Sequence, residues 1–164
     1  GDRRGPDDGR KVAVADPDAS PSTFPDGVDP APLRPAPDLD ELPALVRASR
    51  RAGLAVALTV TGSSRAVAPP VSRAAYRIVQ EALTNVTRHS AAGRAEVIVD
   101  CAEHGGLRVE VTDPGPPVPA ARAGTGVGIV GMRERAAATG GTLVAEPRPG
   151  AGFTVRASWP RRRP

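Results

Sequence analysis

The chain has 164 residues, 40% of them hydrophobic, which is enough for one domain with its own core plus extensions. Its formal net charge of +4 comes almost wholly from arginine, since Lys11 is the only lysine, and only four residues are aromatic. Stacking on bases requires aromatic side chains, so we expect no direct nucleic-acid partner. The single cysteine, Cys101, excludes an internal disulfide and a cysteine-based metal cluster, and its apolar neighbours indicate a half-buried strand thiol.

Residues 1–37 are rich in Pro, Asp, Gly and Ser and show no sustained hydrophobic period, which predicts a disordered arm or linker. Order is expected to begin near Asp38, where Asp38 or Asp40 can cap a short helix that ends at Gly53. The apolar run 54–60 that follows is typical of a strand.

A long amphipathic helix is predicted from Val71 to about His89. Its apolar residues fall at i, i+3, i+4, i+7, i+8 and i+11, which places them on one buried face. Beside that face, Glu81, Asn85 and Arg88 project within an arc of about 60°. Amide and carboxylate oxygens suit Mg²⁺, and Arg88 and His89 are placed to meet phosphates; an ordinary amphipathic helix with a polar shoulder is the alternative. The apolar residues are Ala75, Ile78, Val79, Ala82, Leu83 and Val86.

Four more strands and one more helix are predicted after this long helix. With the elements before them they give about five strands and three helices in mixed order, which indicates an α+β two-layer sandwich with the helices on one face of a mixed sheet. The domain should span residues 38–160, with a solvated basic tail at 161–164. The predicted ranges are 94–101 and 107–112 for a hairpin, 128–139 for the helix, and 142–146 and 152–159 for the last strands.

The loop before that last helix, residues 113–126, holds four prolines and three glycines and is longer than a simple connection needs. Such loops are often binding loops or lids. At its start, Asp113 can accept a hydrogen bond from an exocyclic amine such as that of adenine. At its end, glycines before a helix let backbone N–H groups approach phosphate oxygens. The alternative is a glycine-rich surface loop in which Asp113 serves as a turn residue.

Residues 126–131 also fit the GxGxxG pattern of dinucleotide-binding folds, and Glu146 lies twenty residues after Gly126. That fold needs a strand running directly into the first glycine, whereas residues 116–123 are proline-rich. Only 18 residues follow Glu146, too few to complete a doubly wound sheet. The sequence therefore argues against a dinucleotide site, and the absence of GxxxxGK[ST] excludes a P-loop.

Taken together, these segments resemble the GHKL superfamily (HATPase_c), the ATPase fold shared by histidine kinases, Hsp90, gyrase B and MutL. The GMRER segment is similar to the nitrate-sensor-like subgroup of sensor histidine kinases, which usually serve response regulators with a helix-turn-helix output domain. The segments that carry the resemblance are residues 80–85 with 88–89 for the N box, 113–115 and 124–128 for two glycine boxes, and 131–135 for the subgroup.

The resemblance implies the ATP-binding catalytic domain of a sensor histidine kinase, which uses Mg-ATP for phosphoryl transfer to a histidine on a separate dimerisation domain. By this resemblance Asn85 holds Mg²⁺, and Glu81 positions a metal-bound water and is the second catalytic residue. Asp113 binds the adenine amine. The implied ATP-binding residues are Asn85, Arg88, His89, Asp113, Gly115, Gly124, Gly126, Gly128 and Met132.

Two departures from the family pattern matter. Pro114 stands where the family commonly has Asn or Asp, and because proline lacks an N–H donor, nucleotide affinity is expected to be altered. The family's phosphoacceptor histidine precedes an acidic residue, but His89 precedes Ser90 and His104 precedes Gly105. Autophosphorylation within this chain is therefore not expected, and without the dimerising segment we expect a monomer.

The remaining expectations concern location and alternative functions. No apolar run approaches the roughly 20 residues that span a bilayer, so we expect no membrane contact by this chain. A lone unpaired cysteine agrees with a reducing compartment, which predicts a cytoplasmic location, whether or not the whole kinase is membrane-anchored. Two alternatives stay open: a stand-alone GHKL protein such as an anti-sigma-factor-type serine kinase, and a degenerate nucleotide-binding docking module.

Overall fold

The computed structural model describes residues 35–102, 106–116, 126–149 and 152–161. The predicted order of elements is confirmed within these residues, and strand ends differ from the predicted ones by at most two residues. The predicted arm lies outside the described residues up to residue 34. The elements are η1 (Leu39–Glu41), α1 (Leu42–Arg51), β1 (Ala55–Gly62), η2 (Ser64–Ala66), α2 (Pro69–His89), β2 (Arg94–Cys101), β3 (Leu107–Asp113), α3 (Val127–Ala137), β4 (Thr142–Pro147) and β5 (Phe153–Trp159).

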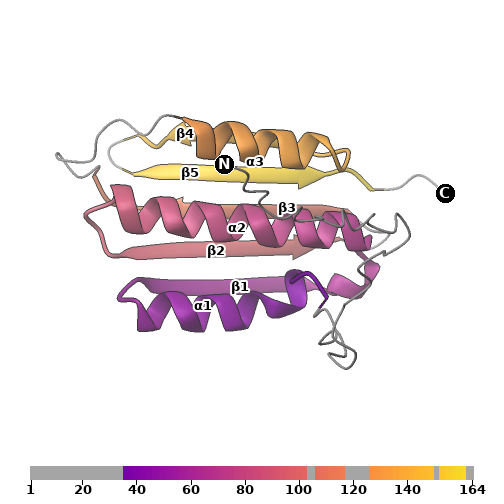
Figure 1. Cartoon of the computed structure of the whole chain (residues 1–164), viewed down its shortest axis with the longest axis horizontal. Coiled ribbons are helices and arrows are strands. Elements are labelled where there is room, and N and C mark those ends of the chain that lie inside the picture. The colour runs from indigo at the N-terminus through magenta and orange to yellow at the C-terminus, as the bar shows by residue number, and fades with distance from the viewer. Residues whose placement is uncertain (1–34, 103–105, 117–125, 150–151, 162–164) are drawn as a thin grey trace, which may run out of the picture. The chain divides into compact units, whose positions relative to one another are not determined.

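The five strands form one mixed sheet in the order β1-β2-β3-β5-β4. β1 and β2 run parallel and are joined through α2, whereas the other three neighbouring pairs are antiparallel. Figure 1 shows α1 along β1, α2 across the middle of the sheet and α3 along β4 and β5. This arrangement confirms the predicted two-layer α+β sandwich, and its mixed sheet differs from the doubly wound parallel sheet of a dinucleotide-binding fold.

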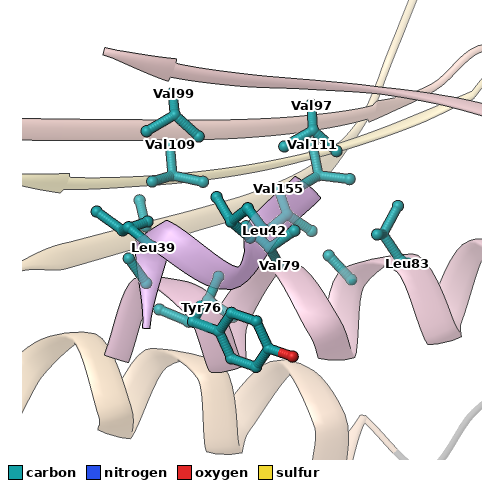
Figure 2. Packing of buried hydrophobic residues seen from close by; sticks show 14 of the residues in the cluster. Leu39, Leu42, Tyr76, Val79, Leu83, Val97, Val99, Val109, Val111 and Val155 are labelled. Carbon is teal, nitrogen blue, oxygen red and sulfur yellow. The ribbon is translucent and has the colours of Figure 1, made fainter. Parts of the chain in front are cut away.

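The core lies between the sheet and the helices. All six apolar residues predicted for the buried face of α2 are buried, and β2 and β3 bury alternate residues, as a strand with one covered face must. Figure 2 shows Val97, Val99, Val109 and Val111 of the sheet facing the helix side chains. Burying one such side chain fully contributes about 1.5–3 kcal/mol, so this layer of valines anchors α2 and the site residues that it carries.

The other face of the sheet is mostly polar, with Ile98 and Val144 as exposed apolar residues. Glu110 at its centre pairs with two arginines, Arg108 at 3.2 Å and Arg156 on the neighbouring strand at 3.0 Å. The hydrogen bond from Arg156 is the largest cause that lowers the pKa of the Glu110 carboxyl below its usual value of 4.5. Salt bridges of this kind are partly exposed and contribute modestly to stability.

Two further features of the described residues bear on the sequence predictions. Cys101 was expected to be half-buried but is only 5% exposed, because its side chain belongs to the covered face of β2. Burial is the main cause that raises its pKa, followed by repulsion from Asp100, so the thiol is protonated at neutral pH. No helix among the described residues is both long enough and apolar enough to cross a bilayer.

Candidate functional site

A cavity of about 980 Å³ opens between the C-terminal half of α2, the end of β3 and the start of α3. Its volume lies within the range of small-molecule binding pockets. Residues far apart in sequence but predicted to share one site meet in its lining. Those residues are Glu81, Asn85, Arg88 and His89 from α2, Asp113 and Gly115 from the end of β3, and Gly126 and Gly128 from the start of α3.

The apolar part of the lining comes from the sheet and the two helices. Val111 and Val155 are buried sheet residues at its base, and Phe153 is partly buried at the start of β5. Ile129 contributes from α3 and Val86 from α2. An apolar surface of this kind accommodates a flat ring, which the polar groups at the rim can then orient.

Asp113 is the buried acid of the cavity, and the residue is 7% exposed. Its Oδ1 accepts two hydrogen bonds, from the Ser90 hydroxyl at 2.6 Å and from the Gly115 backbone N–H at 2.9 Å. No hydrogen bond from the described residues reaches Oδ2. Because no buried side-chain oxygen or nitrogen in the described residues lacks a partner, Oδ2 keeps some accessible surface. Asp113 lines the cavity, so Oδ2 is the carboxylate oxygen left to accept a hydrogen bond from a ligand.

The chain directly after Asp113 is tied to the connection between α2 and β2. The Ala91 N–H donates to the Pro116 carbonyl at 3.2 Å, and the Ala92 N–H donates to Ser90 Oγ at 3.1 Å. Gly115 packs so closely here that a Cβ would lie 2.3 Å from the Ala92 Cβ, so only glycine fits. Pro114 removes one N–H donor, but Asp113 takes its hydrogen bonds from Ser90 and Gly115, so the carboxylate keeps both.

Gly152 restrains the backbone of Asp113 from the other side. Its φ is +99°, and an added Cβ would lie 2.0 Å from the Asp113 carbonyl oxygen. Both the backbone conformation and the lack of space require glycine. The acid is therefore fixed by contacts from three separate segments of the chain.

The second polar group of the cavity forms where α3 begins against α2. Gly126 caps α3 with a left-handed φ of +70°, which glycine adopts without strain. At Gly128 an added Cβ would lie 2.6 Å from Glu81 Oε1 and 3.5 Å from Asn85 Nδ2. Glycine at this position thus lets the two helices meet with Glu81 and Asn85 side by side.

Glu81 and Asn85 provide oxygen donors of the type that Mg²⁺ prefers, and Mg²⁺ usually takes one or two protein ligands with water and phosphate oxygens. Among the described residues no three His, Cys, Asp or Glu side chains cluster into a metal site. A cage made only of protein ligands is thus not formed by these residues, but the Glu81–Asn85 pair fits a magnesium ion that arrives with a phosphate group.

Two of the predicted site residues are not placed in the cavity by the described structure. Gly124 lies outside the described residues. Met132 is fully buried, with 0% exposure, and does not belong to the cavity lining, because it faces the core from α3. Ser90 was missed by the sequence analysis as a site residue; a hydroxyl residue directly after a helix carries no periodic signal, and its partner lies 23 positions away.

A second concavity, of about 820 Å³, lies over the start of β1 and β2. Arg50, Arg94 and Arg148 border it, and Arg50 Nε already donates to the Val56 carbonyl at 2.9 Å. None of the predicted site residues lines it. Of these two cavities, both lined by described residues, it is the first that combines an apolar wall, a fixed acid, an oxygen-donor pair and the basic side chains Arg88 and His89.

Residues 71–163 match the protein-family model described as histidine kinase-, DNA gyrase B- and HSP90-like ATPase. The chain is 38% identical over 111 residues to the sensor histidine kinase YxjM of Bacillus subtilis (strain 168), a match that covers 67% of this chain and 27% of that protein. It is 31% identical over 110 residues to the sensor histidine kinase LnrJ of the same strain, with the same coverage. The chain thus aligns with about a quarter of the length of these relatives.

Solved structures agree on the fold. The blue-light activated histidine kinase of Erythrobacter litoralis EL346 aligns with a TM-score of 0.57 and 21% identity, covering 76% of this chain and 42% of that one. The histidine kinase AdeS of Acinetobacter baumannii aligns with a TM-score of 0.57 and 17% identity, covering 77% and 66%.

Proposed function

The chain belongs to the histidine kinase-, DNA gyrase B- and HSP90-like ATPase family, and from this premise we propose that it is the ATP-binding catalytic domain of a sensor histidine kinase. One observation carries the proposal most strongly. A single cavity joins the Glu81–Asn85 pair to a fixed acid, Asp113, across an apolar wall. These are the groups needed to hold the base and the phosphates of a nucleoside triphosphate with its magnesium ion.

The proposed roles follow from position and chemistry. The Asp113 Oδ2 accepts a hydrogen bond from the exocyclic amine of adenine, whose ring lies against the apolar wall. Arg88 and His89 contact the phosphates. Asn85 would hold Mg²⁺ and Glu81 would orient a water bound to it; the ion would neutralise phosphate charge. Phosphoryl transfer depends mainly on such positioning and charge neutralisation, so the chain needs no covalent nucleophile of its own.

The wider setting of the domain is also a proposal. The GMRER segment at residues 131–135 supports the nitrate-sensor-like subgroup, and with it a dimerisation domain that supplies the phosphoacceptor histidine and a response regulator with a helix-turn-helix output domain. We propose a cytoplasmic location and a monomeric state for this chain alone. Both curated relatives are sensor histidine kinases by name, which favours this function over a stand-alone serine kinase or a docking module.

The nucleotide site is tested by calorimetric titration of ATP into the chain with and without Mg²⁺. We expect saturable binding of ATP by the unmodified chain. Asp113→Asn should weaken this binding, and Asn85→Ala should remove its dependence on Mg²⁺. Asp100→Asn makes the same chemical change on the exposed face of β2 and should leave both affinities unchanged. If the unmodified chain does not bind ATP, the proposed function is wrong and a docking role becomes the better hypothesis.

Phosphoryl transfer is tested separately by adding the dimerisation domain of a related kinase such as YxjM, together with ATP labelled on the γ-phosphate. Transfer to histidine gives an acid-labile phosphoryl group, whereas transfer to serine gives an acid-stable one. Acid-labile label on the added domain, lost in Asn85→Ala, is the expected result. Acid-stable label on an added protein would instead support a serine kinase.

A further inference from the structure

We propose that Ser90 is a positioning residue for nucleobase recognition, which holds the Asp113 carboxylate so that Oδ2 alone faces the ligand and selects a purine bearing an amine. This inference rests on the proposed function of the cavity. Ser90 does not line the cavity itself. It stands behind Asp113, so any effect that it has on the ligand must pass through the acid.

The direction of the Ser90 hydrogen bond is fixed by its surroundings. Ser90 Oγ lies 3.1 Å from the Ala92 backbone N–H, which can only donate, and 2.6 Å from Asp113 Oδ1. A serine hydroxyl has one proton and can accept as well as donate. It therefore accepts from Ala92 and gives its single proton to Asp113.

Ser90 is itself held rigidly. It follows the last residue of α2 in an extended conformation, with φ −107° and ψ 137°, and its N–H donates to the Val86 carbonyl at 2.9 Å. The hydroxyl is thus placed by the same helix that carries Asn85 and His89. Helix α2 and the residue directly after it thus supply both the proposed phosphate contacts and the hydroxyl that holds Asp113.

The consequence for Asp113 is a carboxylate with two unequal oxygens. Two donors, Ser90 Oγ and Gly115 N–H, converge on Oδ1. Rotation of the carboxylate by a half-turn only exchanges two equivalent atoms, but smaller rotations break one or both bonds. With the plane of the carboxylate fixed, Oδ2 keeps one position, so a donor N–H of a ligand gains a hydrogen bond there without ordering the acid first.

Without the Ser90 hydroxyl, Asp113 keeps only the Gly115 donor and its carboxylate can turn. Loss of the Ser90 hydroxyl should lower the affinity only of a ligand that forms a hydrogen bond with Oδ2. A purine nucleotide with hydrogen in place of the 6-amino group makes no hydrogen bond there, so its affinity should not depend on Ser90. This difference separates a role in recognition from a role in stability alone.

The experiment measures dissociation constants of ATP and of purine riboside triphosphate, which lacks the 6-amino group, for the unmodified chain, Ser90→Ala and Ser90→Thr. We expect Ser90→Ala to weaken ATP binding about fivefold, the value of one modest hydrogen bond, and to change the affinity for the analogue less than about twofold. Ser90→Thr keeps the hydroxyl and should restore most of the ATP affinity. Ser49→Ala is the matched control, because it deletes a serine hydroxyl that bonds only the Leu45 carbonyl in α1.

Equal weakening of both ligands by Ser90→Ala, or no weakening of either, would overturn the positioning role while leaving the ATP site intact. If the unmodified chain binds neither ligand, the proposed function fails and this inference fails with it. Should Ser90→Ala not fold, Ser90→Cys keeps the shape with a weaker donor. The affinities of Ser90→Cys for ATP and for the analogue are then compared in the same way. The positioning role again requires that only the affinity for ATP falls.

Discussion

The close approach of α3 to Glu81 allows a test that separates the site from the fold. In Gly128→Ala the new Cβ would lie 2.6 Å from Glu81 Oε1, while 3.4 Å is the lower limit of ordinary contact. The carboxylate must therefore retreat by about 0.8 Å or more. Because the obstructed atom is the far end of a flexible side chain, the helices need not separate, and the fold should survive.

The matched control is Gly131→Ala, which adds the same methyl group less than one turn later in α3. Gly131 borders the same cavity, but nothing lies within 4 Å of its added Cβ. Replacing glycine by alanine inside a helix stabilises it by about 0.5–1 kcal/mol. We expect Gly131→Ala to raise the free energy of unfolding by that amount and Gly128→Ala to change it by less than about 1 kcal/mol in either direction.

Calorimetry then measures how much Mg²⁺ increases the affinity for ATP in each variant. Groups that orient metal ligands typically account for 10–100-fold in metal affinity, so a displacement of Glu81 should reduce the magnesium effect about tenfold in Gly128→Ala. Gly131→Ala should keep the full effect. If Gly128→Ala stays folded and shows the same dependence on Mg²⁺ as the unmodified chain, Glu81 does not serve the metal and its proposed role must be abandoned.

Three further predictions use other contacts. In Asp113→Asn the amide oxygen should keep the two donors at the Oδ1 position, which places the NH₂ group at the Oδ2 position. Competition binding should then show a lower affinity for ATP relative to inosine triphosphate, whose 6-oxo group is an acceptor. An unchanged ratio of the two affinities would contradict the proposed orientation of the Asp113 carboxylate. In Gly115→Ala the new Cβ would lie 2.7 Å from the Ala92 backbone nitrogen. Urea denaturation should show a free energy of unfolding lower by about 2 kcal/mol, whereas unchanged stability would disprove the close packing. The depressed pKa of Glu110 means that its ionised form stabilises the fold fully above the usual value of 4.5, and that this stability is lost as the pH falls below 4.5 and through the lowered pKa of the folded state. Glu110→Gln should therefore cost about 0.5–1 kcal/mol at pH 7 and progressively less as the pH is lowered below 4.5, and a pH-independent difference would be evidence against the ion pairs.

The order of the elements follows from the sequence because each depends on near neighbours. The buried face of α2 repeats at the helical period, and β3 alternates polar and apolar residues, so both elements carry their own signal. Helix α3 carries no such periodic signal, because Val127 and Val130 are 69% and 51% exposed while Met132 is fully buried. Its position could be predicted from glycines at both ends, but not which of its residues face the core.

The candidate site likewise has features that the sequence predicts and features that only the tertiary structure decides. The residue types of α2 and of the loops predict an acid, an amide and glycines suited to a nucleotide, because motif spacing within one segment is local information. The contacts of Ser90 with Asp113, of Gly152 with the Asp113 carbonyl and of Gly128 with Glu81 join segments 23 to 47 positions apart. No local period encodes such distances. They are decided only when α2, β3 and α3 pack on one sheet, since packing alone determines which side chains finally touch.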